Sequence, residues 1–210
     1  MQRVILVVLA VVVASAAALA QSPKAATYIT DEEIKAVNAT PGVDRTIRVI
    51  DIGNENFAVG VIHRGATGAG RGTAAGAGGA RGAAPAPEPC GEQASTPPAG
   101  TPSGLTHDSQ TEGYIIISGG GTLITGGRIV NGRKSAPDGA VTKELNGPSC
   151  SGMIVGSDVV KRVVKTGDII IIPAGVPHGW TDIADHVDYL SLRPSDHVLQ
   201  AGYVHPALKK

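Results

Sequence analysis

The 210-residue chain has few charged and few aromatic residues, and each shortage excludes a class of function. Charged residues make up 17%, and 18 Lys+Arg are balanced by 18 Asp+Glu. A nucleic-acid-binding surface needs an excess of positive charge, so nucleic acid is excluded as a partner. Aromatic residues are only 3%, which predicts a core built on Ile, Val and Leu with little aromatic surface for stacking a sugar or a base.

Cysteine is scarce as well, because Cys90 and Cys150 are the only two in the sequence. No Cys-x-x-Cys or Cys/His spacing occurs, so a structural zinc site is not indicated. In an oxidising compartment the two residues could form a disulfide that closes a loop of about 60 residues. The alternative is a pair of unpaired thiols in loops, and the sequence leaves both readings open.

The first 20 residues have the pattern of a secretory signal peptide. Arg3 precedes an apolar run over residues 4–13, and small residues follow up to Ala18-Leu19-Ala20. A membrane anchor would need about 20 apolar residues, and this run is shorter. We therefore expect cleavage after Ala20, export to the periplasm or the exterior, and no membrane attachment of the mature chain.

A long central segment is dominated by three residue types. Residues 65–104 contain 11 Gly, 11 Ala and 6 Pro, or 28 of 40 positions. Such a composition buries too little apolar surface to offset the entropy of ordering, so it predicts a disordered insert.

The rest of the mature chain reads as short strands after one helix. Thr30 and Glu33 form a capping box, which predicts a short helix that ends at about Ala39. This helix and the first strands fall within residues 21–64. Apolar alternation and Gly-rich turns without helical periodicity indicate an all-β sandwich, barrel or jelly roll. The polar stretch 131–153 is expected to be a long loop, and residues 196–210 a C-terminal tail. The predicted strands are 45–52, 57–63, 114–117, 122–125, 159–165, 168–172 and 186–192.

One segment carries a specific motif. Residues 167–180 read GDIIIIPAGVPHGW. This stretch resembles the second motif of the cupin superfamily, G(X)5PXG(X)2H(X)3N, with Gly167, Pro173, Gly175 and His178 on the pattern. Asp182 stands where the motif has its final Asn.

The first cupin motif, G(X)5HXH(X)3-4E(X)6G, is matched in part. Glu112 and Gly119 have the spacing of its second half, and His107 takes the place of its second His. Leu105 occupies the place of its first His. The resemblance to cupins therefore departs from the family pattern at one metal ligand.

The resemblance implies a single cupin-type domain, a double-stranded β-helix or jelly-roll barrel with its core over residues 105–195. Cupins usually hold a divalent metal with three His and one Glu. Carried over by position, this chain offers His107, Glu112 and His178. Two imidazoles and one carboxylate favour Fe or Mn, with Zn, Ni or Cu as alternatives.

Three further residues lie near these motifs. His63, in phase with Val59 and Val61, is a reserve ligand in place of Leu105, although an ordinary strand-end histidine is the favoured interpretation. His186 is a second reserve. Tyr114 is expected to reach the centre as a second-shell donor if its strand alternates regularly from Glu112.

Two functions follow from the implied metal site. The first is a small-molecule enzyme of dioxygenase or isomerase/lyase type. The second is a non-catalytic module that binds a small molecule or a metal, which the missing His favours. Cupins often pair, so a homodimer is also expected from the resemblance.

Overall fold

The computed structural model describes residues 25–67 and 87–209. The predicted signal peptide, residues 1–20, and much of the predicted insert lie outside the described residues. No helix in the described part of the chain is long and apolar enough to cross a membrane.

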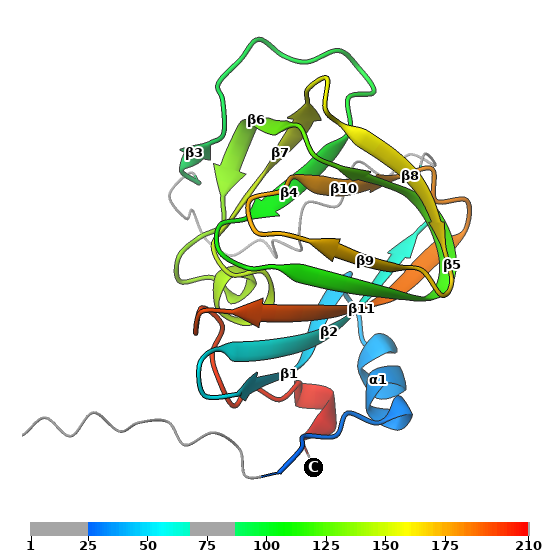
Figure 1. Ribbon diagram of the computed structural model, residues 1–210, viewed down its shortest axis with the longest axis vertical. Coiled ribbons are helices and arrows are strands. Elements are labelled where there is room, and N and C mark those ends of the chain that lie inside the picture. The colour runs from blue at the N-terminus through cyan, green and yellow to red at the C-terminus, as the bar shows by residue number, and fades with distance from the viewer. Residues whose placement is uncertain (1–24, 68–86, 210) are drawn as a thin grey trace, which may run out of the picture.

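The strands form two antiparallel sheets that share one long strand (Figure 1). Strand β5 pairs with β11 and β9 through its first half, and with β10 and β8 through its second half. The eleven strands are β1 (Asp44–Asp51), β2 (Asn56–Gly65), β3 (Pro89–Cys90), β4 (Ser103–His107), β5 (Glu112–Thr125), β6 (Arg128–Lys134), β7 (Ser149–Val155), β8 (Val160–Lys165), β9 (Ile169–Ile172), β10 (His178–Thr181) and β11 (His186–Ser195). This antiparallel arrangement of two sheets joined through β5 confirms the all-β, double-stranded β-helix prediction.

Three successive glycines allow β5 to pass from one sheet to the other. A Cβ atom on Gly119, at φ +67°, would lie 2.0 Å from the carbonyl oxygen of His186. A Cβ on Gly120 would lie 2.5 Å from the carbonyl oxygen of Val164. Only glycine fits these approaches, so the predicted break between residues 117 and 122 is a bend within one strand.

The predicted N-terminal helix is present as α1 (Asp31–Asn38), with both hydrogen bonds of the Thr30–Glu33 capping box. Its buried Val37 packs against Ile47 and Val61 on the outer face of the β1–β2 sheet. The helix therefore covers the outside of the barrel and leaves the interior to the inward-facing side chains.

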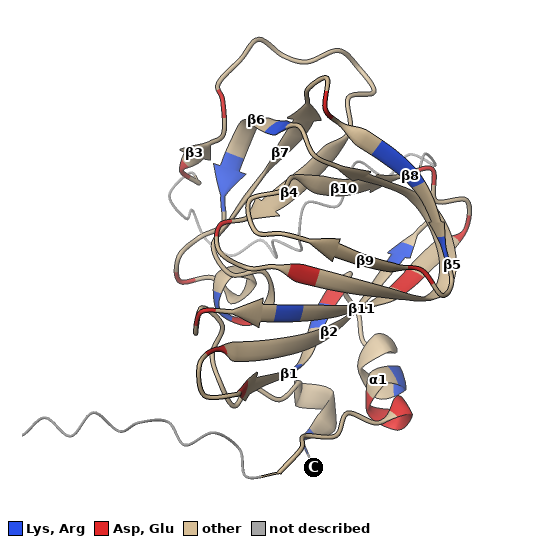
Figure 2. Cartoon of the chain, in the orientation of Figure 1, with Lys and Arg blue, Asp and Glu red and all other residues tan. Residues whose placement is uncertain are grey.

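The barrel interior is more aromatic than the composition predicts. Tyr114, Trp180 and Tyr189 lie in the main core cluster together with Ile, Val and Leu side chains. Half of the six aromatic residues of the chain thus meet at one place. Figure 2 shows charged residues mainly on α1, on the outer strands and in the loops, with β9 and β10 uncharged.

The insert predicted over residues 65–104 was too long at its C-terminal end. Residues 87–104 are described, and they include β3, which pairs with β6, and the start of β4. A disulfide joins Cys90 to Cys150, with the two Cα atoms 6.0 Å apart, and ties β3 to β7. The sequence left open a disulfide or two unpaired thiols, and the structure contains the disulfide.

Two other segments are more ordered than expected. The predicted loop over residues 131–153 is shorter, because β6 extends to Lys134 and β7 begins at Ser149. Between them lies one short π-helix, η1 (Val141–Leu145). The predicted tail buries Leu199, pairs with β1 through Val204 and ends in η2 (Pro206–Leu208).

Candidate metal centre

The structure brings His107, Glu112 and His178 together inside the barrel. His107 ends β4, Glu112 begins β5 after a four-residue turn, and His178 begins β10. β10 runs beside both β4 and β5, which places the three side chains within reach of one another. They are 2%, 2% and 3% exposed, so the group is almost fully enclosed.

The three side chains converge on one oxygen atom. The Nε2 atoms of His107 and His178 each lie 3.1 Å from Glu112 Oε2. One ligand atom from each residue lies within 4.8 Å of the others. Two ligands bound at about 2.1 Å and at right angles lie about 3.0 Å apart, so these spacings suit a common cation.

The hydrogen bonds of the two imidazoles assign their tautomers. His107 Nδ1 lies 2.7 Å from the carbonyl oxygen of Asn146, and His178 Nδ1 lies 2.9 Å from that of Val176. Because a carbonyl only accepts, each Nδ1 carries the proton and each Nε2 presents a lone pair. These lone pairs face a carboxylate oxygen, and buried His107 Nε2 has no hydrogen-bond partner among the described residues. A divalent cation fits this donor set, because it satisfies all three atoms at once.

Glu112 is held so that only one of its oxygens is available. Its Oε1 accepts hydrogen bonds from Ser191 Oγ at 2.8 Å and from Arg193 Nε at 2.7 Å. Its Oε2 accepts one from the Tyr114 hydroxyl at 2.7 Å. With Oε1 occupied by two donors, Glu112 can offer a metal only Oε2, as a monodentate ligand.

Charge in this enclosed site is balanced by Arg193. Burial alone would raise the pKa of the Glu112 carboxyl, but the positive charge of Arg193 holds that pKa well below its usual range. Arg193 is 1% exposed and also donates to Asp44 Oδ2 at 2.5 Å and to the Leu145 carbonyl oxygen at 2.9 Å. Glu112 is therefore ionised and ready to bind a cation.

The loop that holds η1 closes over this centre. Consecutive carbonyl groups of Leu145 and Asn146 accept from Arg193 and from His107. One short segment thus fixes a candidate ligand and the arginine that supports another. Such outer contacts orient ligands and are as much part of a metal site as the ligands.

The structure does not bring the reserve histidines to this group. His63 lies on the outer face of β2, half exposed, with Nδ1 2.6 Å from Asp188 Oδ1. His186 is bound to Ser118 and Asp185. His63, which the sequence offered only as a reserve ligand, lies away from the group because its strand face, shared with Val61, packs outside the barrel under α1.

Leu105, at the place of the absent first His, lies on β4 two residues before His107 and opposite His178 on β10. Side chains two apart on a strand share a face, so Leu105 borders the centre with an apolar group. The described residues therefore supply three candidate ligand atoms where the family motif has four.

The sequence did not predict three residues that support the centre, namely Arg193, Ser191 and Asp44. A usable signal existed, because Val187, Tyr189, Ser191 and Arg193 alternate on the inward face of β11. A charged residue in the inward phase of a barrel strand indicates a buried charge that needs a partner.

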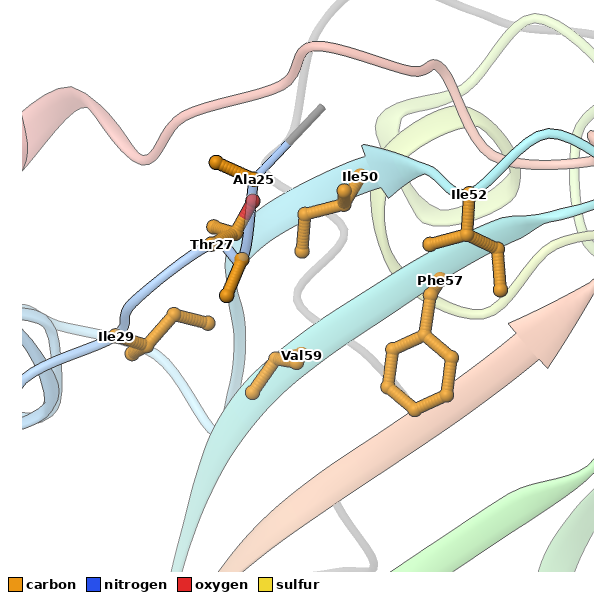
Figure 3. Close-up of a pocket in the computed structure, with 8 residues that line it drawn as sticks. Ala25, Thr27, Ile29, Ile50, Ile52, Phe57 and Val59 are labelled. Carbon is orange, nitrogen blue, oxygen red and sulfur yellow. The ribbon is translucent and has the colours of Figure 1, made fainter. Parts of the chain in front are cut away.

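A separate apolar pocket of about 390 Å³ lies between residues 25–29 and the strands β1 and β2 (Figure 3). Its walls include Ile50, Ile52, Phe57 and Val59, and no ionisable side chain lines it. Its described lining therefore offers neither a metal ligand nor an acid or base.

Comparisons with known proteins find only distant structural similarity. No protein-family model and no curated protein matches this sequence. An uncharacterized conserved protein with a double-stranded beta-helix domain from Klebsiella pneumoniae is 15% identical, with 83% of this chain and 94% of that chain covered and a TM-score of 0.37. A cupin protein from Bacteroides fragilis is 12% identical, with coverages of 73% and 78% and a TM-score of 0.31. An oxalate oxidase bound to glycolate is 13% identical over 76% of this chain and 55% of its own, with a TM-score of 0.33.

Proposed function

We propose that this cupin barrel binds a divalent metal through His107, Glu112 and His178 and acts on a small molecule as a dioxygenase or as an isomerase or lyase. The observation that carries the proposal is the pair of imidazole lone pairs aimed at one ionised carboxylate oxygen in an enclosed site. Without a cation, this arrangement leaves buried polar atoms unsatisfied.

The donor set favours particular metals. Two imidazole nitrogens and one carboxylate oxygen with vacant positions are the ligand set of non-haem iron oxygenases, so Fe or Mn is favoured, with Zn, Ni or Cu as alternatives. When bound, the metal would supply Lewis acidity or a redox centre at its open positions.

The chain's own residues determine how the ligands are presented. Ser191 and Arg193 hold Oε1, so Glu112 contributes one oxygen and leaves more positions open than a bidentate carboxylate would. The backbone bonds of both imidazoles fix their tautomers and their ring orientation. Leu105 supplies no ligand atom at the fourth position, and its apolar side chain borders that side of the centre.

The alternative is a non-catalytic module that stores or senses a metal or a small molecule. The near-complete burial of all three ligand side chains favours it, because catalysis requires a substrate to reach the metal. Turnover measurements separate the two functions, since a binding module holds its ligand without changing it.

Metal analysis tests the proposal directly. The purified protein is expected to bind about one equivalent of Fe(II) or Mn(II), and His107→Ala and His178→Ala are expected to lose it. His63→Ala is the matched control, since His63 lies outside the barrel and its loss is expected to leave the metal content unchanged. A wild-type protein that binds none of Fe(II), Mn(II), Zn(II), Ni(II) or Cu(II) would overturn the proposal. Oxygen consumption and product analysis with the loaded protein then divide enzyme from binder.

We further propose that the chain works outside the cytoplasm. The Cys90–Cys150 disulfide supports this, because such bridges persist mainly in oxidising compartments. Sequencing the N-terminus of the secreted protein tests it, with Gln21 as the expected first residue. A homodimer stays a prediction, and sedimentation of the purified protein measures it.

A further inference from the structure

An arginine on the inward face of β2, near the end of the strand, has no acidic partner among the described residues. Arg64 is half-buried on β2, in phase with the inward-facing Ile62, and its Nε donates to the Tyr189 hydroxyl at 3.0 Å. Neither of its Nη atoms has a hydrogen-bond partner among the described residues, and Arg64 forms no ion pair with them. The other interior arginine, Arg193, is by contrast bound on all three nitrogens.

A second unpaired donor lies against the same tyrosine. Trp180 is 9% exposed, its ring stacks on Tyr189 with centroids 5.4 Å apart, and its buried Nε1 has no partner among the described residues. An indole nitrogen can only donate, and so can a guanidinium. The buried indole donor without an acceptor costs free energy, and the half-buried Arg64 guanidinium contacts the same tyrosine through its Nε.

These donors belong to the same interior as the candidate metal centre. The Tyr114 hydroxyl bonds to Glu112 Oε2, and the Tyr114 ring packs on Tyr189 with centroids 4.3 Å apart. Tyr189 in turn accepts from Arg64. One aromatic cluster thus connects the metal ligand at one end to the unpaired cation at the other.

The chemistry of the donors selects the ligand. A guanidinium with two free Nη groups suits the two oxygens of a carboxylate, and an indole N–H adds a third donor to an oxygen. Asp44 acts on Arg64 only through space, since its Oδ2 is hydrogen-bonded to Arg193. One uncompensated positive charge matches one negative charge, which favours a carboxylate over a doubly charged phosphate.

We propose that Arg64 and Trp180 form an anion subsite and that the substrate is a small organic acid. Its carboxylate binds Arg64, and a second oxygen of the same molecule would face the metal that His107, Glu112 and His178 would hold. This substrate class rests on the proposed metal site, whereas binding of the carboxylate to Arg64 does not depend on a metal.

Calorimetric titration of the purified full chain tests the subsite. The probes are acetate, malonate, succinate and glutarate, each compared with its uncharged amide, in metal-free protein and in protein loaded with Mn(II). At least one acid is expected to bind about tenfold or more tightly than its amide, because a charge-assisted pair replaces a neutral contact. Loading with Mn(II) is expected to tighten binding of the acid further.

Variants assign the effect to the named residues. Arg64→Gln is expected to weaken binding of the preferred acid about tenfold or more, and Arg64→Lys to keep part of it. Trp180→Phe keeps the ring and removes the donor, so a smaller loss is expected. Arg162→Gln, which removes an exposed arginine on β8, is the matched control and is expected to bind as the wild type does.

The outcomes separate this inference from the proposed function. Acids that bind no better than their amides, or equal binding by wild type and Arg64→Gln, would overturn the anion subsite even if Mn(II) binds. Arg64-dependent binding of acids in a protein that takes up no metal would overturn the metal site and keep the subsite. Equal affinity for sulfate and for every acid would show a general anion site and reject the organic acid as its ligand.

Discussion

Removing Arg193 tests whether its positive charge stabilises the buried carboxylate of Glu112 in the barrel interior. Arg193→Met keeps much of the side-chain volume but leaves Glu112 and Asp44 without their buried cation, and the Leu145 carbonyl without its donor. Removing one partner of a buried ion pair costs about 3–5 kcal/mol. We expect the metal-free variant to lose that much unfolding free energy at pH 7.

The pH dependence of this loss gives a second, sharper observable. In the wild type the pKa of Glu112 is held well below its usual range, so Glu112 contributes stability above about pH 4.5 that is lost as pH falls. Without Arg193, the effect of burial is no longer offset by that cation, and the pKa of Glu112 rises. A carboxyl with a raised pKa loses stability as pH rises, so the gap between wild type and variant should widen from pH 4.5 to pH 7.

Urea unfolding with EDTA at pH 4.5, 5.5 and 7 measures both effects. Arg162→Met is the matched control, because Arg162 is exposed on β8, and its cost should stay within about 0.5 kcal/mol at every pH. A loss below about 1 kcal/mol at pH 7, or a gap that does not change with pH, would refute the assignment of Arg193 as the counter-charge of Glu112.

Three further predictions concern the centre and its support. Leu105→His adds the fourth ligand of the family motif, so competition with a chelator should show metal affinity raised about tenfold or more. Tyr114→Phe removes the donor to Glu112 Oε2 while the fold is kept; we expect one equivalent of metal at an affinity reduced about tenfold, and unchanged affinity would remove Tyr114 from the site. Replacing Cys90 and Cys150 together by Ser opens a link across a sequence separation of 60, and calorimetry should show a loss of about 4 kcal/mol, whereas a loss under 1 kcal/mol would contradict the entropic argument.

Local patterns in the sequence predicted the fold well because strands and turns leave local signals. The alternation over 45–52 marks β1, and the run before Pro173 marks β9. The bend within β5 was missed because it depends on the close approach of His186 and Val164 from other strands. Loop 131–153 was overestimated for a related reason, since β6 and β7 are stabilised by their pairing with each other.

The candidate site likewise has residues that the sequence predicted and residues that depend on the tertiary structure. His107, Glu112 and His178 follow from motif spacing, because the cupin motifs encode ligands at fixed positions on neighbouring strands. Arg193 lies 81 residues from Glu112 in sequence, and no local pattern connects the two. The direction in which His63 points depends on which strand face α1 covers, and this is a tertiary property.

The scarcity of aromatics acquires a different meaning once their places are known. The chain has only six aromatics in 210 residues, yet Tyr114, Tyr189 and Trp180 form one group of packed rings beside the centre. Aliphatic side chains would fill the same barrel volume without polar atoms to satisfy. Packing alone therefore does not explain why two hydroxyl groups and an indole N–H lie in this interior. One hydroxyl bonds to the metal ligand and the other to Arg64, so the group joins the two ends at which we expect one small acid to bind.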